Sequence, residues 1–355
     1  MHIDDLLAIM LKEDASDLHI KAWSKPYIRV YGALKLIDGA PKLNPQDSEQ
    51  LALSMMTAEQ RDDFHAEWEV DFAYAMKDGT RFRVNAYRQR GSVAAVFRVI
   101  PAKIQTIDDL QLPPVIKEFC KRPRGLVLVT GPTGSGKSTT LAAMVDYINT
   151  KRAEHIITIE DPIEFVHQNK LSLINQREVG KDTQSFHGAL RRALRQDPDV
   201  VLIGEMRDLE TISTAITTAE TGHLVLATLH TTGAAQTVDR IIDVFPPEQQ
   251  TQIRMQTAGN IQGIISQTLL PHISGRGRVA AFEIMVPTGA MRNLIRDGKT
   301  YQIQSSMHMS KGQGMVTLEQ SFADLVKRRQ ITKEVAFAKA PDPNQLKEIM
   351  KSMTI

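Results

Sequence analysis

Gly131-Pro132-Thr133-Gly134-Ser135-Gly136-Lys137-Ser138 is the stretch of this sequence that decides its fold. It follows an apolar run at residues 126–129 and leads into a helical pattern, which is the setting that a phosphate-binding loop requires. The glycines let the backbone curl until several amides face a phosphate, and the start of the helix adds partial positive charge. The lysine then reaches the terminal phosphates, and the serine hydroxyl is a ligand for Mg²⁺. The predicted nucleotide site consists of Gly131, Pro132, Thr133, Gly134, Ser135, Gly136, Lys137, Ser138 and Thr139.

This loop lies in a part of the sequence that has the pattern of an α/β fold. Four continuous apolar runs predict strands that are buried on both faces. Helical patterns separate the runs, so we expect a parallel sheet covered by helices on both sides. The four strands are predicted at residues 126–129, 156–159, 200–203 and 224–229, the whole α/β core at 115–285, and a helical C-terminal region at 286–355.

The first hundred residues have a different pattern, in which apolar and polar positions alternate. Residues 80–87 show this alternation, which is typical of a strand with one buried face. A single strand is expected at residues 27–34 and a helix at 45–65. Residues 1–100 are therefore predicted to form a small α+β domain. A linker is expected at 101–114, where two consecutive prolines favour a domain boundary.

The overall charge and the single cysteine limit the class of protein. With 43 basic and 41 acidic residues the formal charge is +2, which gives no support to a nucleic-acid binder. Cys120 is the only cysteine, so an intrachain disulfide is excluded, and we expect a buried, inert thiol. The sequence has neither a signal-peptide pattern nor the ~20 consecutive apolar residues of a membrane span. We therefore expect a cytoplasmic protein that reaches a membrane only through a partner.

Acidic residues follow two of the predicted strands. Glu205 comes after the run at 200–203 and is preceded by glycine where an aspartate is usual. Glu160 and Glu164 belong to a cluster of three carboxylates within five residues after another strand. We predict that Ser138, Glu205 and Glu160 hold Mg²⁺. Either Glu205 or Glu164 is predicted to activate water, and ordinary surface carboxylates are the alternative.

Two histidines, His223 and His230, bracket the predicted strand at residues 224–229. A zinc site would need further ligands, and no cysteine or additional histidine clusters here. His230, at the carboxyl end of the strand, is predicted to sense the γ-phosphate. A structural hydrogen bond is the alternative role for an isolated histidine.

Taken together, these segments resemble the secretion-type hexameric ATPases. Their Walker A motif, Asp box, atypical Walker B motif and His box are similar in order and spacing to residues 131–138, 160–164, 200–205 and 221–230. Within that family the chain most resembles the type IV pilus retraction ATPases. The similar segments are Ser16-Asp17-Leu18-His19 and Ala290-Met291-Arg292-Asn293-Leu294-Ile295-Arg296. In the second segment methionine stands where isoleucine is usual, a change between apolar residues of similar volume.

The resemblance implies a RecA-like C-terminal domain and a smaller PAS-like N-terminal domain in a homohexamer that hydrolyses ATP with Mg²⁺. It implies an ATP site that lies between the two domains and is completed by a neighbouring protomer. It also implies arginines that reach the phosphates, a role that suits guanidinium because it is always charged and forks onto phosphate oxygens. With the arginines that match the family, the predicted catalytic residues are Lys137, Glu205, Glu164, His230, Arg83, Arg98, Arg191 and Arg195.

The function implied by the resemblance is a motor that powers pilus retraction, pilin disassembly and twitching motility. Its partner would be the inner-membrane platform protein of the pilus, so we expect a peripheral location at that membrane. A retraction accessory paralogue and a pilus-assembly or type II secretion ATPase are alternatives within the family. A nucleic-acid translocase needs a basic or aromatic-lined channel, which balanced charge and 5% aromatic residues do not favour. The intact acidic residues disfavour a non-hydrolysing nucleotide sensor.

Overall fold

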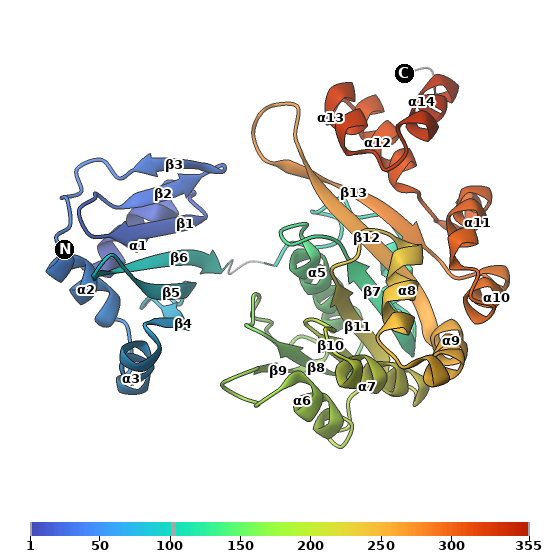
Figure 1. Cartoon of the computed structure of the whole chain (residues 1–355), viewed down its shortest axis with the longest axis horizontal. Coiled ribbons are helices and arrows are strands. Elements are labelled where there is room, and N and C mark those ends of the chain that lie inside the picture. Colours follow the sequence, from blue (N-terminus) through green and yellow to red (C-terminus); the bar gives the residue numbers. More distant parts are fainter. Residues whose placement is uncertain (1, 101–103, 354–355) are drawn as a thin grey trace. The chain divides into compact units, whose positions relative to one another are not determined.

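The structure of the chain is a computed structural model that describes residues 2–100 and 104–353. The chain divides into two compact units, Met1–Lys103 and Ile104–Ile355, which we call the first and the second unit. Figure 1 shows both, coloured along the sequence from blue to red. Of the predicted linker, residues 101–103 lie outside the described residues, whereas Ile107 and Leu112 are buried in the core of the second unit.

The first unit is an antiparallel sheet with helices on one face. Its strand order is β3 (Ala33–Leu36), β2 (Tyr27–Val30), β1 (Asp17–Lys21), β6 (Ser92–Ile100), β5 (Arg81–Gln89) and β4 (Glu69–Ala75). Along β5, Phe82 and Val84 are buried whereas Arg83 between them is exposed, as expected for a sheet with one covered face. The covering helices, whose apolar residues share a core with the sheet, are α1 (Ile3–Lys12), α2 (Pro45–Leu53) and α3 (Ala58–Glu67).

Two elements of the first unit differ from the sequence predictions. The single strand predicted at residues 27–34 is wrong, because Tyr31 and Gly32 form a turn with φ of 48° and 87° that separates β2 from β3. Turns of this hand match the twist of a hairpin. The single helix predicted at 45–65 is also wrong, because Thr57 accepts a hydrogen bond from the Gln60 amide and starts α3 as a separate helix. Hydrophobic periodicity does not register such local breaks.

The second unit is a sheet with helices on both faces. Its strand order is β13 (Arg278–Met285), β12 (Ile261–Pro271), β7 (Gly125–Thr130), β11 (Leu224–Leu229), β10 (Val200–Ile203), β8 (His155–Glu160) and β9 (Leu173–Glu178). The four strands predicted from apolar runs are confirmed as its parallel centre. Strands β12 and β13, which were not predicted, extend this sheet and form an antiparallel hairpin at one edge.

Each face of this sheet packs against its own helices. One set is α6 (Phe186–Ala193), α7 (Leu209–Glu220), α8 (Ala234–Asp243) and α9 (Pro247–Asn260), and the other is α4 (Val115–Cys120) and α5 (Lys137–Lys151). Val201 and Val225 belong to the core on the first side, and their neighbours Val200 and Leu224 to the core on the second. Burial on both sides explains why these strands are continuous apolar runs in the sequence.

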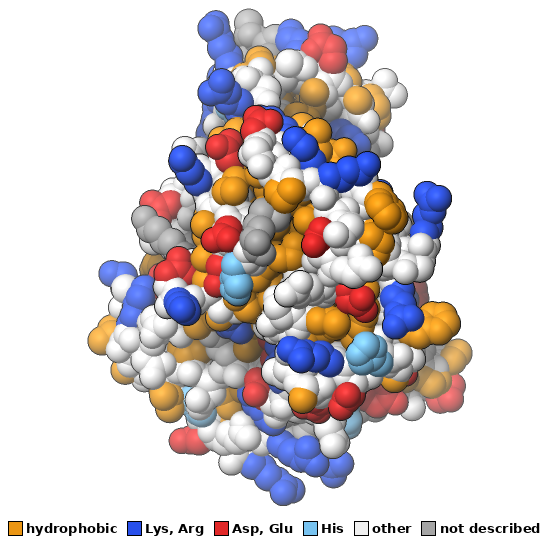
Figure 2. Space-filling view, turned by 90° about the vertical axis from the view of Figure 1, so that its left-hand side faces the viewer, with side chains coloured by type: hydrophobic (Ala, Val, Ile, Leu, Met, Phe, Trp, Pro, Cys, Tyr) orange, Lys and Arg blue, Asp and Glu red, His pale blue; other side chains and the backbone are white. Residues whose placement is uncertain are grey.

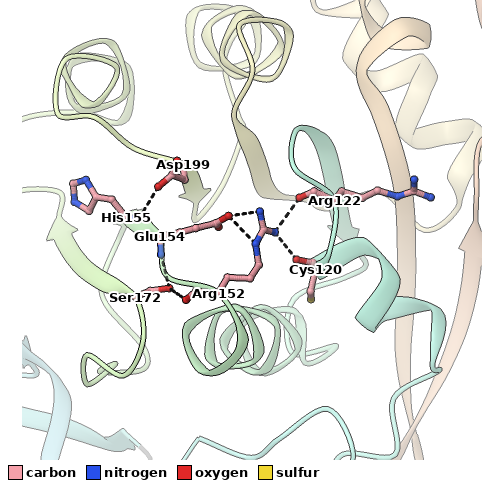
Figure 3. A network of polar contacts seen from close by, with 7 residues as sticks. All are labelled: Cys120, Arg122, Arg152, Glu154, His155, Ser172 and Asp199. Carbon is pink, nitrogen blue, oxygen red and sulfur yellow. Dashed lines mark hydrogen bonds and ion pairs between the residues drawn. The ribbon is translucent and has the colours of Figure 1, made fainter.

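A polar network fastens the amino-terminal edge of this sheet (Figure 3). The Arg152 guanidinium, just after α5, donates to the carbonyl oxygens of Cys120 at 2.7 Å and Arg122 at 3.0 Å, and it pairs with Glu154. These bonds join the ends of α4 and α5 to the start of β8. Cys120 itself is buried, and burial raises the pKa of its thiol to about 12. The prediction of a buried thiol is therefore confirmed, and the raised pKa disfavours the reactive thiolate.

The C-terminal region is helical, as predicted, and continues from β13. Its first helix, α10 (Gly289–Arg296), contains the segment that resembles the retraction ATPases. Met291 and Ile295 are fully buried, and Arg292 donates to the carbonyl oxygens of Gly259 at 3.0 Å and Ile261 at 2.7 Å. The segment is thus anchored on the end of α9. The remaining elements are α11 (Ile303–Met309), α12 (Leu318–Lys327), α13 (Lys333–Lys339), α14 (Pro343–Ser352) and 3-10 turns at Thr300–Gln302 and Lys311–Gln313.

The surface and the helix lengths bear on the class of protein. Within residues 2–100 and 104–353, no helix is long and apolar enough to cross a membrane. On the face drawn in Figure 2, acidic and basic side chains are interspersed with apolar and uncharged ones. This mixture agrees with the nearly balanced total charge of the chain.

Candidate functional site

Parallel strands bring several predicted site residues to one edge of the second unit. Strands β7, β11, β10 and β8 are neighbours, so their carboxyl ends lie side by side (Figure 1). Residues 131–138, which we call the phosphate loop, follow β7, and His230 follows β11. Glu205 comes soon after β10, and Glu160 ends β8. The topology thus gathers groups that are far apart in the sequence, as the carboxyl ends of parallel strands do.

The phosphate loop has the backbone that glycine adopts without strain. The angle φ is 139° at Gly131, 76° at Gly134 and 91° at Gly136. Gly131 lies against β12, where a Cβ would come within 2.2 Å of the Gln267 carbonyl oxygen. Gly136 precedes α5 and has no side chain to accept from the first amides of that helix. Those amides are therefore donors for an anion.

Lys137 is held against its own loop. Its Nζ donates to the carbonyl oxygens of Gly131 at 2.9 Å and Pro132 at 3.1 Å. Burial lowers the pKa of Lys137, while the carboxylates of Glu205 and Glu164 act in the opposite direction. An anion in the loop would replace two neutral carbonyl partners by a charged one, which forms stronger hydrogen bonds.

Glu205 is held by two partners at the end of β10. Its Oε1 lies 2.6 Å from Nε of Arg207 and 3.1 Å from Nε2 of His230. Burial would raise the pKa of Glu205, but Arg207 and His230 outweigh burial and bring this pKa below its ordinary value. Glu205 is therefore an anion at neutral pH, and it can orient water or a hydrated cation.

The glycine before Glu205 has a packing reason. A Cβ at Gly204 would lie 3.2 Å from the carbonyl oxygen of Ile159 and 3.3 Å from Cα of Glu160. The Thr228 hydroxyl also donates to the Gly204 carbonyl at 2.5 Å, which holds this segment beside β11. An aspartate at this position would press on β8.

Glu160 and Glu164 lie in different surroundings, although both belong to the cluster at the end of β8. Glu160 accepts from the Thr158 hydroxyl at 2.6 Å and from the Gln176 amide at 3.2 Å. Burial raises the pKa of Glu160, and these two hydrogen bonds oppose the rise. Glu164 is exposed. Glu160 is thus a fixed group, whereas Glu164 is in contact with solvent.

Three other residues of the second unit lie away from the phosphate loop of their own chain. His223 precedes β11, and its Nδ1 lies 3.1 Å from the Thr218 carbonyl oxygen, which agrees with a structural role. Helix α6 begins beside Gly204 and ends near the start of β8, where the Asp197 carbonyl contacts His155. Arg191, near the end of α6, and Arg195, just after it, are both exposed.

Arg83 and Arg98 belong to the first unit, on the polar face of its sheet. They are opposite each other on β5 and β6, and Arg98 is also opposite Asp17 on β1. Asp17 is buried and its carboxylate lies 2.8 Å from Nε of Arg98 and 3.8 Å from Nε of Arg29. This pairing uses Nε of Arg98 and leaves its two terminal nitrogens for another partner, and 70% of the side chain is exposed.

Two residues of the site were missed in the sequence. Arg207 stands two positions after Glu205, and that spacing could have marked it as a partner. Gln267 had no such signal. It donates to the Ser135 carbonyl and accepts from the Thr140 hydroxyl, from which it is separated by 132 and 127 positions in the chain. Only the pairing of β12 with β7 brings it to the loop.

The donors at this edge suit a cation that prefers oxygen. No cluster of three or more His, Cys, Asp or Glu side chains in the described part of the chain could hold a metal ion. Mg²⁺ needs only one or two protein ligands, because it keeps several waters and shares the phosphates of its substrate. The oxygen donors of Ser138, Glu205 and Glu160 therefore fit Mg²⁺ that binds together with a nucleotide.

Comparison with known proteins finds relatives along nearly the whole chain. Residues 2–337 match the family described as type II/IV secretion system protein. The chain is 51% identical to the type IV pilus retraction ATPase PilT of Pseudomonas aeruginosa, over 97% of this chain and 99% of that protein. It is 41% identical to the type IV pilus ATPase PilU of the same organism, over 99% of this chain and 92% of that protein.

A solved structure has the same architecture. The crystal structure of the pilus retraction motor PilT with bound ADP matches with a TM-score of 0.92 and 48% identity. The match covers 98% of this chain and 99% of that one. It confirms the predicted fold class, a RecA-like P-loop domain with a smaller α+β N-terminal domain.

Proposed function

Because the chain belongs to the type II/IV secretion system protein family, we propose that it is an ATP-hydrolysing motor that powers type IV pilus retraction. The observation that carries this proposal is the nearly full-length similarity to PilT. That similarity includes the first unit and most of the C-terminal helices as well as the nucleotide core. A likeness confined to the phosphate loop would support nucleotide binding alone.

ATP binding relies on the phosphate loop and the start of α5. Their amides donate to phosphate oxygens, and Lys137 exchanges its carbonyl partners for the phosphates. Bound Mg²⁺ neutralises charge on the β- and γ-phosphates. Ser138, Glu205 and Glu160 would hold this ion, directly or through water.

Glu205 orients the attacking water in this proposal. Its support is the position at the end of β10 and the lowered pKa, which keeps the carboxylate ready to accept a hydrogen bond from water. Glu164 is the second candidate for this role. His230 contacts the same carboxylate as Arg207, so a shift of Glu205 after loss of the γ-phosphate would break the contact with His230.

The motor is proposed to work as a homohexamer. The support is the exposed position of Arg191 and Arg195, away from the phosphate loop of their own chain, where a neighbouring protomer could use them. Arg83 and Arg98 would add positive charge at the phosphates and release it when the γ-phosphate leaves. The resulting movement would act on the platform protein of the pilus in the inner membrane and release pilin, with the motor on the cytoplasmic side.

A complementation experiment tests this function. In a strain that lacks the gene, the wild-type chain should restore twitching, and Lys137→Ala should not, although both proteins accumulate equally. Purified wild-type chain should release phosphate from ATP. A chain that binds and hydrolyses ATP but restores no motility would contradict the pilus role while leaving the ATPase assignment intact.

A retraction accessory protein is the second candidate, because the 41% identity to PilU also extends over nearly the whole chain. The two candidates differ in what deletion of the gene does. Loss of all twitching indicates the principal motor. Twitching that persists indicates the accessory role.

A further inference from the structure

A buried glutamine connects the phosphate loop to the neighbouring strand. Gln267 is 3% exposed and lies on β12 directly after Ser266, which is paired with Thr130, the last residue of β7. Strand β12 therefore continues beside the loop into which β7 leads. This position lets one side chain of β12 reach the loop backbone.

Both polar atoms of the Gln267 side chain are used there. Nε2 donates to the Ser135 carbonyl oxygen at 2.7 Å, and Oε1 accepts from the Thr140 hydroxyl at 2.9 Å. A backbone carbonyl can only accept a hydrogen bond, so the amide nitrogen of Gln267 must face Ser135. The amide oxygen then accepts the hydrogen bond from the Thr140 hydroxyl. A Cβ at Gly136 would lie 3.0 Å from Nε2, so a side chain there would disturb this contact.

The bond to Ser135 determines the orientation of a whole peptide group. In a trans peptide, the carbonyl and the following N–H point in opposite directions. With the Ser135 carbonyl held toward β12, the N–H of Gly136 points away from β12. Glycine restricts backbone rotation less than any other residue. A partner outside the loop is therefore needed to keep the peptide between Ser135 and Gly136 in one orientation.

We propose that Gln267 is a positioning residue for the nucleotide, which keeps the Gly136 amide directed at a phosphate oxygen. This inference rests on the proposed ATPase function and deepens it. Without the glutamine, the Ser135 carbonyl would be free to turn inward and place partial negative charge where the phosphate binds. Arg278 on β13 donates to the Gly134 carbonyl at 3.4 Å, so the same hairpin holds a second carbonyl of the loop.

Nucleotide affinity of the full-length chain tests the inference. Gln267→Met keeps the length of the side chain and removes both hydrogen bonds. The Kd for a fluorescent ADP analogue should rise about tenfold or more, the effect expected when a buried carbonyl loses its donor. Gln256→Met is the matched control, because Gln256 lies on the surface of α9 and donates a hydrogen bond to Glu220. The Kd of this variant should stay within about twofold of the wild-type value.

Gln267→Glu separates positioning from general packing. A carboxylate cannot donate to Ser135, whereas the protonated acid can, and burial raises the pKa of such a group. The Kd of this variant relative to wild type should therefore approach one as the pH falls from about 8 to about 5.5. Thermal unfolding of each variant without nucleotide shows whether the fold is intact.

The outcomes are distinct. Wild-type affinity in Gln267→Met would overturn the inference, and so would a Gln267→Glu variant whose relative Kd does not depend on pH. A wild-type chain that binds no ADP would instead overturn the proposed function, whatever the variants do.

Discussion

The two sheets of this molecule carry their charged groups in different ways. In the second unit the central strands are buried on both faces, so Glu205 and its partners are confined to the ends of strands. In the first unit one face is polar, and a row of charged residues crosses four strands: Arg29, Asp17, Arg98 and Arg83. A sheet covered on both sides concentrates charge at an edge, whereas a sheet covered on one side can spread it over a face.

The largest effect on ATP hydrolysis is expected in the second unit, whose sheet is covered on both faces. Lys137→Ala removes the cation of the phosphate loop and should reduce phosphate release by about a thousandfold or more, because charge neutralisation is most of what phosphoryl transfer requires. Lys151→Ala, at the exposed far end of the same helix, should keep full activity. Equal activity of the two variants would show that the edge of this sheet is not the catalytic site.

The next effect distinguishes two carboxylates at that edge. Glu205→Gln should retain ATP but lower turnover by about a hundredfold to a thousandfold, since a neutral amide orients water poorly. Glu164→Gln should have a smaller effect, because Glu164 is exposed. Single-turnover hydrolysis and nucleotide binding should be measured for both. A larger loss of turnover in Glu164→Gln than in Glu205→Gln would indicate that Glu164 orients the attacking water.

The pH dependence of stability compares a half-buried histidine of the second unit, His167, with an exposed histidine of the first, His65. Burial lowers the pKa of His167 from 6.5 to about 4. The folded chain keeps this ring neutral, whereas the unfolded chain protonates it, so its contribution is present above pH 6.5 and is lost as the pH falls toward 4. The contribution is at most about 3 kcal/mol.

Urea unfolding at several pH values measures this contribution. His167→Gln should weaken the loss of stability between about pH 6.5 and about pH 4. His65→Gln, at an exposed position of α3, is the control for the substitution itself. A His167→Gln profile that coincides with the wild type would mean that this ring is not held neutral by the fold.

The smallest effect is expected on the polar face of the first unit. Asp17→Asn keeps the shape of the side chain but weakens its hold on Arg98, and it leaves the guanidinium groups of Arg29 and Arg98 less neutralised. Turnover should fall by about threefold to tenfold, corresponding to about 1 kcal/mol. Asp71→Asn is the control, because its contact with Arg83 is 3.9 Å long and 60% of its side chain is exposed. Unchanged turnover in Asp17→Asn would show that the contact of Asp17 with Arg98 does not contribute to turnover.

Local features of this protein could be predicted from its sequence. The phosphate loop, the four central strands and the helical C-terminal region all follow from short-range rules, because glycine torsions and hydrophobic periodicity are properties of neighbouring residues. Breaks such as the turn at Tyr31 and Gly32 were missed, since two residues inside a longer periodic run change the periodicity very little.

The phosphate loop was therefore determined by the sequence itself, as a motif and as a site for a nucleotide. Only the tertiary structure showed what holds the loop in place. Gln267 and Arg278 reach it because β12 pairs with β7 and β13 returns beside β12, and no local pattern records that pairing. The same holds for the contact of Glu205 with His230. Such contacts depend on strand order and register, which are set by the packing of the whole sheet and not by the residues around each side chain.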